Sequence, residues 1–361
     1  MKKVIFLSVI ALAAAVSCSK SEVVDTKFES EAIGFDTYLG RDAQTKATET
    51  TAANLAEFGV YGFYTAAVDY ASGTTANLMN HVQVTKSGSA WTYSPARYWT
   101  NDTDKYTFFA YAPSSVGEAD GAPVIEYTVD ENLANQKDAI YSVNNRNVTK
   151  TSCKQTDGTY VPFEFKHALS RIAVKANAKM YDKTTGLEVT TPAANQEYDH
   201  TFTIKNISLS GKFCTTGTMD LSEPFTTAQD GTVSGGPVWT STPSAVTYNL
   251  TGAVSQPLTK DPYKFSEIAN NYLMVIPTTF SADKDAEGNY TNAAALTIQY
   301  TVTYAGATSD VITKTVYVTT GFEQGKAYVI ELTLQRNDDN AIIFNVKGVD
   351  RWEDDQTVTL S

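Results

Sequence analysis

The sequence predicts an all-β protein, and three observations carry this prediction. Short segments of alternating apolar and polar residues recur along the chain, whereas the helical repeat of apolar residues is nearly absent. The 21 Tyr and 16 Phe residues, together with frequent Thr, favour half-buried pleated surfaces. Turns rich in Gly, Asp, Asn and Ser separate the segments, which is typical of β-sandwiches. The 361 residues give length for two such sandwiches.

The chain begins with the features of an export signal, predicted over residues 1–17. Lys2 and Lys3 precede an apolar run, residues 4–16, which is too short to span a bilayer but suits a signal peptide. The run stops at Cys18, after small residues, as in bacterial lipoproteins. An ordinary secretory signal with a chance cysteine is the alternative, and the position of Cys18 argues against it. We therefore expect lipidation of Cys18 and a membrane-tethered protein outside the cytoplasm.

A short strand and an exposed polar segment follow the signal. Residues 33–39 alternate, so that Ile33, Phe35 and Leu39 share one face. Residues 41–53 are small and polar and carry Arg41 and Lys46, the basic residues that a trypsin-like protease needs. From the residues alone, this segment reads either as a plain linker or as a site of proteolytic processing.

The rest of the chain continues as predicted strands. They cover residues 58–64, 106–111, 124–129, 139–143, 172–176, 202–209, 246–250, 272–276, 296–304, 311–318, 328–334, 342–346 and 357–360. A boundary near Phe163–Ser170 divides the chain into an N-terminal sandwich, residues 42–162, and a C-terminal sandwich, residues 163–361. Tyr98 and Trp99 are expected in a core, and Trp352 either in a core or near the last strand.

Composition and motifs exclude several classes of function. A net charge of −12 without a Lys/Arg cluster argues against nucleic-acid binding. His81, His167 and His200 lack metal-ligand spacing, and no catalytic or nucleotide-binding motif is present, so we expect neither a metal nor a cofactor. His167 is interpreted as a neutral imidazole between strands, bonded to a backbone carbonyl. The sequence does not decide whether Cys153 and Cys214 form a disulfide.

Several segments, in order, resemble the fimbrillin-like family, the lipoprotein-derived subunits of type V pili in Gram-negative anaerobes. The most telling is Phe-Lys-His-Ala-Leu-Ser-Arg-Ile at residues 165–172, and the resemblance covers the whole chain, Cys18 included. The other segments are residues 58–61, 95–99, 106–113, 272–277 and 325–328.

The resemblance implies two tandem transthyretin-like β-sandwiches and a route of assembly. A lipidated precursor reaches the outer membrane, and a trypsin-like or Arg-specific protease cuts after a basic residue, here Arg41 or alternatively Lys46. The propeptide, residues 18–41, then leaves with its strand, and a neighbouring pilus subunit fills the groove. The donor expected here is the C-terminal strand formed by Thr357, Val358, Thr359 and Leu360.

Three functions compete at this stage. The first is a fimbrial structural subunit or pilus-associated adhesin on the cell surface, whose further partners include a host protein or glycan. The second is a surface lipoprotein that binds glycans through tandem sandwiches rich in Tyr and Trp. The third is an enzyme such as a glycoside hydrolase, which would need a pair of carboxylates in a cleft. No motif singles out such a pair, so the sequence predicts a protein that is not an enzyme.

Overall fold

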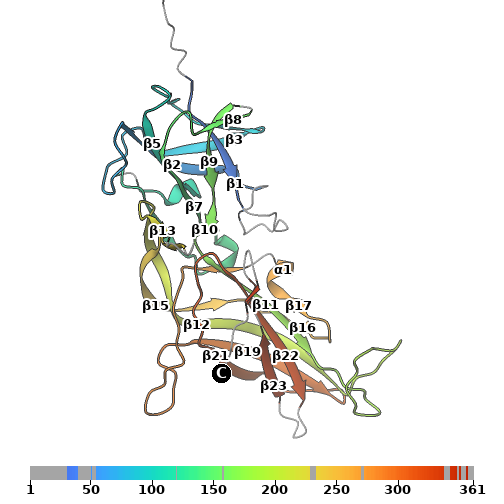
Figure 1. Ribbon diagram of the computed structural model, residues 1–361. Coiled ribbons are helices and arrows are strands. Elements are labelled where there is room, and N and C mark those ends of the chain that lie inside the picture. Colours follow the sequence, from blue (N-terminus) through green and yellow to red (C-terminus); the bar gives the residue numbers. More distant parts are fainter. Residues whose placement is uncertain are drawn as a thin grey trace, which may run out of the picture.

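The computed structural model describes residues 31–39, 50, 54–118, 120–156, 158–227, 233–269, 272–336, 342–347, 349–350 and 355–356. Strands dominate this part of the chain (Figure 1). Its helical elements are α1 (Phe265–Ala269) and two 3₁₀ turns (Ser114–Val116 and Leu133–Asn135). The all-β prediction is confirmed. Within the same ranges, no helix has the length and apolar character needed to cross a bilayer.

The strands at one end of the molecule form two sheets. A six-stranded sheet has the order β10-β7-β5-β2-β3-β4, and a three-stranded sheet has the order β1-β9-β8. The strands are β1 (Gly34–Tyr38), β2 (Glu57–Ala66), β3 (Met79–Ser87), β4 (Ala90–Thr92), β5 (Lys105–Ala112), β7 (Ile140–Val148), β8 (Lys154–Gln155), β9 (Gly158–Glu164) and β10 (Lys166–His167). Figure 1 shows this group in its upper half.

Two larger sheets occupy the other end. One has the order β17-β11-β22-β23, with β18 also paired to β11; the other has the order β15-β12-β19-β20, with β16, β21 and β6 attached. The strands are β6 (Val124–Thr128), β11 (Ser170–Ala178), β12 (His200–Asp220), β15 (Trp239–Asn249), β16 (Gln256–Pro257), β17 (Tyr263–Lys264), β18 (Leu273–Val275), β19 (Ala294–Tyr304), β20 (Ala307–Thr308), β21 (Ile312–Val318), β22 (Ala327–Arg336) and β23 (Ile342–Lys347). Two small pairs are β13 (Phe225–Thr227) with β14 (Val233–Gly235), and β24 (Val349–Asp350) with β25 (Asp355–Gln356).

The predicted strands within the described residues all coincide with observed ones, but the sequence missed others. Strand β3 was not predicted, since its residues alternate poorly. Strand β9 was not predicted either, because Pro162 interrupts its pattern. Strand β12 runs for 21 residues, well beyond the predicted 202–209, and its register with β15 shifts between Cys214 and Gly217. The predicted strand 357–360 lies outside the described residues.

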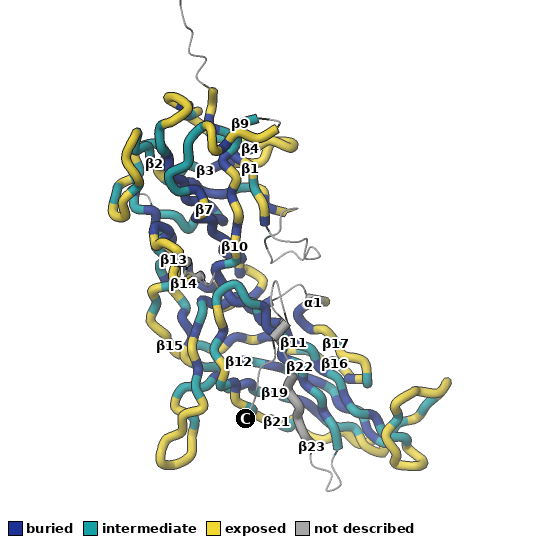
Figure 2. Tube along the Cα trace, in the orientation of Figure 1, coloured by how far each residue is buried: buried dark blue, intermediate teal, exposed yellow. Residues whose placement is uncertain are grey.

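Strand β5 contributes to two hydrophobic cores. Tyr106 and Phe108 point into one cluster with β1 and β9, whereas Phe109 and Tyr111 belong to the cluster that fills the other end of the molecule. Successive side chains of a strand point to opposite faces, so both faces of β5 are buried. This explains why residues 105–112 read as a nearly continuous apolar run. Figure 2 shows the buried positions concentrated along the strands and the exposed ones at the hairpins.

The two groups of sheets are joined through several contacts. Strand β6 lies within residues 42–162 yet pairs with β12 in the far sheet. The side-chain oxygen of Gln136 accepts a hydrogen bond from the backbone N–H of Met274 at 2.7 Å. Arg146 donates to the carbonyl of Ser222 at 2.5 Å. The chain visits the far sheet with β6, returns with β7, and crosses to it again between β10 and β11.

Candidate functional site

The most distinctive site is the bed of strand β1, where Phe35 lies inside a cage of four aromatic rings. The Phe35 ring stacks on Phe163 at 5.4 Å, with 28° between the ring planes. The centroid of Tyr93 also lies 5.4 Å away. Phe108 and Phe58 meet the ring edge to face at 6.0 and 6.1 Å. Such pairs add to the burial of apolar area, so Phe35 is the central anchor of β1.

Two further side chains of the same segment are buried with Phe35. Ile33 is 1% exposed, Phe35 4% and Leu39 8%. The predicted strand and its predicted apolar face are therefore confirmed. Burying three such side chains contributes about 5–9 kcal/mol before the cost of ordering the segment.

The backbone of β1 is held along one edge and at its ends. It pairs in parallel with β9, from Gly34 opposite Tyr160 to Tyr38 opposite Glu164. Around the start of β1, the backbone N–H of Ile33 donates to the carbonyl of Arg97 at 2.8 Å. The hydroxyl of Tyr93 donates to the carbonyl of Ile33, also at 2.8 Å. Since β1 ends the order β1-β9-β8, its ladder within the described residues involves a single neighbouring strand.

The chain after β1 is anchored again at Thr50. The backbone N–H of Thr50 donates to Oδ2 of the buried Asp138 at 3.1 Å. Arg41 and Lys46, the predicted processing residues, fall between these two anchors and lie outside the described residues. The predicted lipidation residue Cys18 and the predicted donor residues Thr357, Val358, Thr359 and Leu360 also lie outside them.

The hydrogen-bond partner of His167 differs from the backbone carbonyl that the sequence analysis expected. Nδ1 of His167 lies 2.7 Å from Oδ2 of Asp138, so the ring meets a buried carboxylate as well as the sheet, and not simply a backbone carbonyl. His81 lies in hydrogen-bond contact with the hydroxyl of Tyr111. Within the described ranges, no group of three or more His, Cys, Asp or Glu side chains is arranged to hold a metal ion.

The cysteines and two aromatic predictions also have definite outcomes. Cys153 and Cys214 are free and buried in different hydrophobic clusters, so the disulfide that the sequence left open is not formed. Burial raises the pKa of the Cys153 thiol to about 11.

Trp99 is 3% exposed, as predicted, whereas Tyr98 is 49% exposed and is not a core residue. Tyr98 lies outside the named strands, in an isolated bridge to Ala32, and its side chain faces solvent while that of Trp99 enters the core. Trp352 lies outside the described residues.

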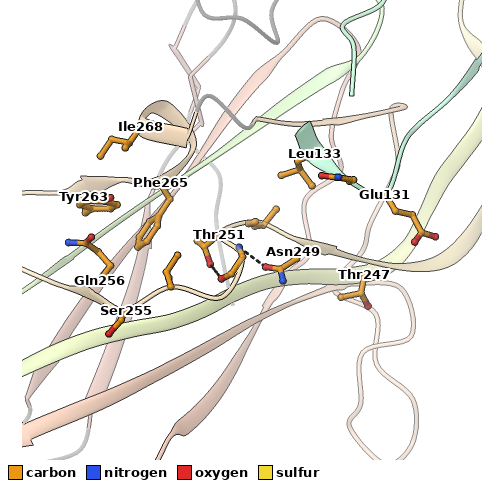
Figure 3. Close-up of a pocket in the computed structure, with 14 residues that line it drawn as sticks. Glu131, Leu133, Thr247, Asn249, Thr251, Ser255, Gln256, Tyr263, Phe265 and Ile268 are labelled. Atoms are coloured by element: carbon orange, nitrogen blue, oxygen red, sulfur yellow. Dashed lines mark hydrogen bonds between the residues drawn. The ribbon is translucent and has the colours of Figure 1, made fainter. Parts of the chain in front are cut away.

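A surface groove of about 690 Å³ lies apart from β1, between α1 and the turn after β15. Figure 3 shows Tyr263, Phe265 and Ile268 along one side of this groove. Glu131 and Asn249 lie on the other side, and Asn249 accepts a hydrogen bond from the backbone N–H of Gly252 at 2.9 Å. Its polar groups are exposed and partly bonded to their own turn, so the groove lacks the convergent buried groups of a formed binding site.

Sequence reasoning missed the residues that complete the cage. Phe163 was placed at a domain boundary, and Tyr93 was not singled out. The signal for Phe163 was available, because Val161, Phe163 and Phe165 alternate. Nothing in the sequence indicates that this segment pairs with residues 34–38, since a parallel pairing between distant segments leaves no local pattern.

Comparisons with known proteins agree with this architecture. The profile of the fimbrillin-like family matches residues 45–350. The fimbrium subunit Fim1C of Phocaeicola vulgatus is 32% identical over an alignment of 189 positions, which covers 46% of this chain and 49% of that protein. The chain thus matches about half the length of this curated relative. A fimbrial protein from Bacteroides vulgatus ATCC 8482, solved by crystallography, is 19% identical and has a TM-score of 0.60. That match covers 89% of this chain and 99% of the other and shows a shared fold.

The family match extends from the polar segment before β2 to the end of β24, far more than half of the chain. It includes the cage residues Phe58, Tyr93, Phe108 and Phe163, although the strand that they enclose lies before its first residue. The resemblance drawn from the sequence is confirmed: the chain belongs to the fimbrillin-like family.

Proposed function

We propose that the chain is a fimbrial structural subunit or pilus-associated adhesin. It is exported as a lipoprotein precursor and polymerises by donor-strand exchange after proteolytic removal of its N-terminal strand. The observation that carries this proposal is β1 itself. It is a short strand at the edge of its sheet, and its apolar face is deeply buried. A segment of small and polar residues that contains Arg41 follows it directly.

Loss of β1 would leave two features that recruit another strand. The outer edge of β9 would present unpaired backbone groups, which act as a template for strand addition. The sites of Ile33, Phe35 and Leu39 would become an apolar groove, and exposed apolar grooves of this kind favour a protein partner. A strand from a neighbouring pilus subunit satisfies both needs.

In this proposal, the lipid on Cys18 delivers the precursor to the outer membrane. It holds the precursor at the outer membrane, and a cut after Arg41 releases the lipid together with residues 18–41. The mature subunit in the cell-surface fimbrium is held by strand exchange with its neighbours. Family membership and the relative Fim1C of Phocaeicola vulgatus support this assignment.

Processing is tested by N-terminal sequencing of protein released from the surface of expressing cells. We expect a mature chain that begins at Asp42 and a shift to Ala47 in an Arg41→Gln variant. Arg41→Lys separates the proteases, because a trypsin-like enzyme still cuts it and an Arg-specific enzyme does not. Lys27→Gln is the matched control, since Lys27 lies upstream within the propeptide. A mature chain that still begins at Cys18 would disprove the proposal.

Assembly is tested by electron microscopy of cells that express wild type or Cys18→Ala. Wild type should form surface filaments, and the variant should not, because its precursor is no longer delivered by the lipid. Normal filaments without Cys18 would contradict the proposed route. A surface glycan-binding lipoprotein would instead stay monomeric after cleavage and be retarded on polysaccharide gels.

A further inference from the structure

The outer face of the sheet that contains β12 carries rows of uncharged, mostly polar side chains. Strands β15, β12, β19 and β21 are neighbours in this sheet, and successive residues of each strand point to opposite faces (Figure 1). The inward residues are buried, among them Leu209, Leu296 and Val318. The outward residues are aligned across the four strands, and two complete rows are Tyr317-Ala295-Ser210-Thr247 and Thr315-Thr297-Ser208-Asn249. Neither row contains a charged side chain.

An exposed aromatic ring stands at one end of the first row. Tyr317 is 37% exposed. The ring of Tyr290 packs against it, with the centroids 4.7 Å apart and 40° between the ring planes. Tyr290 belongs to the hairpin at residues 281–292, where Nζ of Lys284 lies 4.4 Å from the centroid of the Tyr290 ring. The hairpin therefore supports Tyr317 from the side and leaves part of its ring accessible to a ligand.

A hollow of about 560 Å³ lies at the other end of the same row. The side chains in its lining that can form hydrogen bonds are those of Glu131, Ser210, Lys212, Thr247, Thr291 and Asn292. One carboxylate and one ammonium group give this set no net charge. The hollow thus continues the uncharged polar character of the two rows.

The dimensions of the face suit an extended chain of sugar rings. Neighbouring strands lie about 4.8 Å apart, so a row of four residues spans about 14 Å, and successive rows are about 7 Å apart. Each hydroxyl offers one donor and two acceptor sites. The hydroxyls of Thr297 and Thr315 meet at 3.2 Å, and this contact uses only part of their capacity. A sugar chain presents hydroxyls along its edges and C–H groups on its ring faces, which match the rows and the Tyr317 ring respectively.

The same composition argues against other partners. Protein interfaces are enriched in aromatic residues, Met and Arg and depleted in Ser, and both Ser and Thr are rare among the residues that dominate binding. The two rows contain one aromatic residue and neither Met nor Arg. Nucleic acids and anionic polysaccharides require basic side chains, which the rows lack. A neutral glycan remains the partner of matching chemistry.

We propose that this face binds a neutral polysaccharide that crosses β21, β19, β12 and β15, with one sugar ring stacked on Tyr317. The hydroxyl and amide side chains of the two rows bond to the hydroxyls of the polymer. This inference goes beyond the proposed function and does not depend on strand exchange. In a filament, each subunit presents one such face, so that many weak sites act together on one polymer.

The test is native electrophoresis of the full-length protein, purified in detergent, through gels that contain a polysaccharide. The neutral probes are starch, mannan, β-glucan and galactan, and polygalacturonate is the anionic control. At least one neutral probe should retard the wild type, and added salt should not weaken the effect, because no ion pair is involved. Polygalacturonate should cause no retardation.

Point variants locate the binding to this face. Tyr317→Ala should weaken binding about tenfold through loss of the stacking ring, whereas Tyr317→Phe should keep it. Thr315→Val removes a hydroxyl at nearly constant shape and should weaken binding about threefold to tenfold. Tyr304→Ala is the matched control, since Tyr304 is 61% exposed in the same sheet but lies outside both rows.

Two results from the gels would overturn the inference: no retardation by any neutral probe, or equal retardation of wild type and Tyr317→Ala. Electron microscopy of expressing cells separates it from the proposed function. Tyr317→Ala should form normal filaments; loss of filaments with unchanged retardation would assign this face to contacts between copies and overturn the inference. A wild type that is retarded but forms no filaments would contradict the proposed function and leave this inference standing.

Discussion

The ring of Phe35 in β1 stacks on the ring of Phe163 in β9 with centroids 5.4 Å apart, and this contact reinforces the parallel pairing of the two strands. Phe163 also meets Phe58 and Phe165 at 5.7 and 6.0 Å. The cage is therefore one aromatic network, in which Phe35 is the member that the proposed proteolysis would remove.

Replacing Phe35 with Ala should lower the free energy of unfolding by about 3–5 kcal/mol, since it opens a cavity among four rings. Urea unfolding followed by tryptophan fluorescence measures the change. Tyr38→Ala is the matched control in the same strand, because Tyr38 is 59% exposed and its removal should cost within about 0.5 kcal/mol. Equal losses in the two variants would contradict the role of the cage.

Replacing Gly59 with Ala should destabilise the chain by about 1–3 kcal/mol. A Cβ at Gly59 would clash with the buried ring of Tyr111, which lies opposite Gly59 in the neighbouring strand β5. The cost should shrink when Tyr111 is also replaced by Leu, which removes the obstructing ring. A double-mutant cycle of urea unfolding checks this, and strictly additive losses would show that the two residues do not interact.

Acidification below about pH 6.5 should destabilise the chain partly through His200. Burial lowers the pKa of this ring, while Asp199 acts to raise it and Arg336 to lower it. The Tyr181 ring also packs on it, at 5.5 Å. Because the folded-state pKa lies below the unfolded one, the unfolded state takes up the proton first, and stability falls as pH drops through this window. His200→Gln should flatten the dependence between pH 7 and 5; an unchanged slope would exclude His200 as its source.

The thiol of Cys153 should resist alkylation in the folded protein. It is 2% exposed, and a pKa of about 11 leaves little thiolate at pH 8. Iodoacetamide should label it slowly in native buffer and rapidly in urea, as followed by mass spectrometry of the Cys153 peptide. A Cys153–Cys214 linked peptide in a non-reduced digest would contradict the free thiols of the structure.

Local sequence was sufficient to predict both the position and the inward face of strands that bury only one face. Ile33, Phe35 and Leu39 alternate with polar neighbours, and this alternation determines both the strand and its inward face. The apolar runs at residues 58–64 and 106–111 were also predicted as strands. Periodicity could not assign their faces, because both are buried, one towards each core.

By itself, the sequence determined the fold class, the identity of the first strand and the basic residues that follow it. These depend on side-chain alternation and on composition, which act over a few neighbouring positions. Tertiary structure alone decided that β1 lies on β9, that Phe163 and Tyr93 complete its cage, and that β6 joins β12. The physical reason is that pairing between distant strands is chosen by the packing of whole faces, and no short stretch of sequence carries that information.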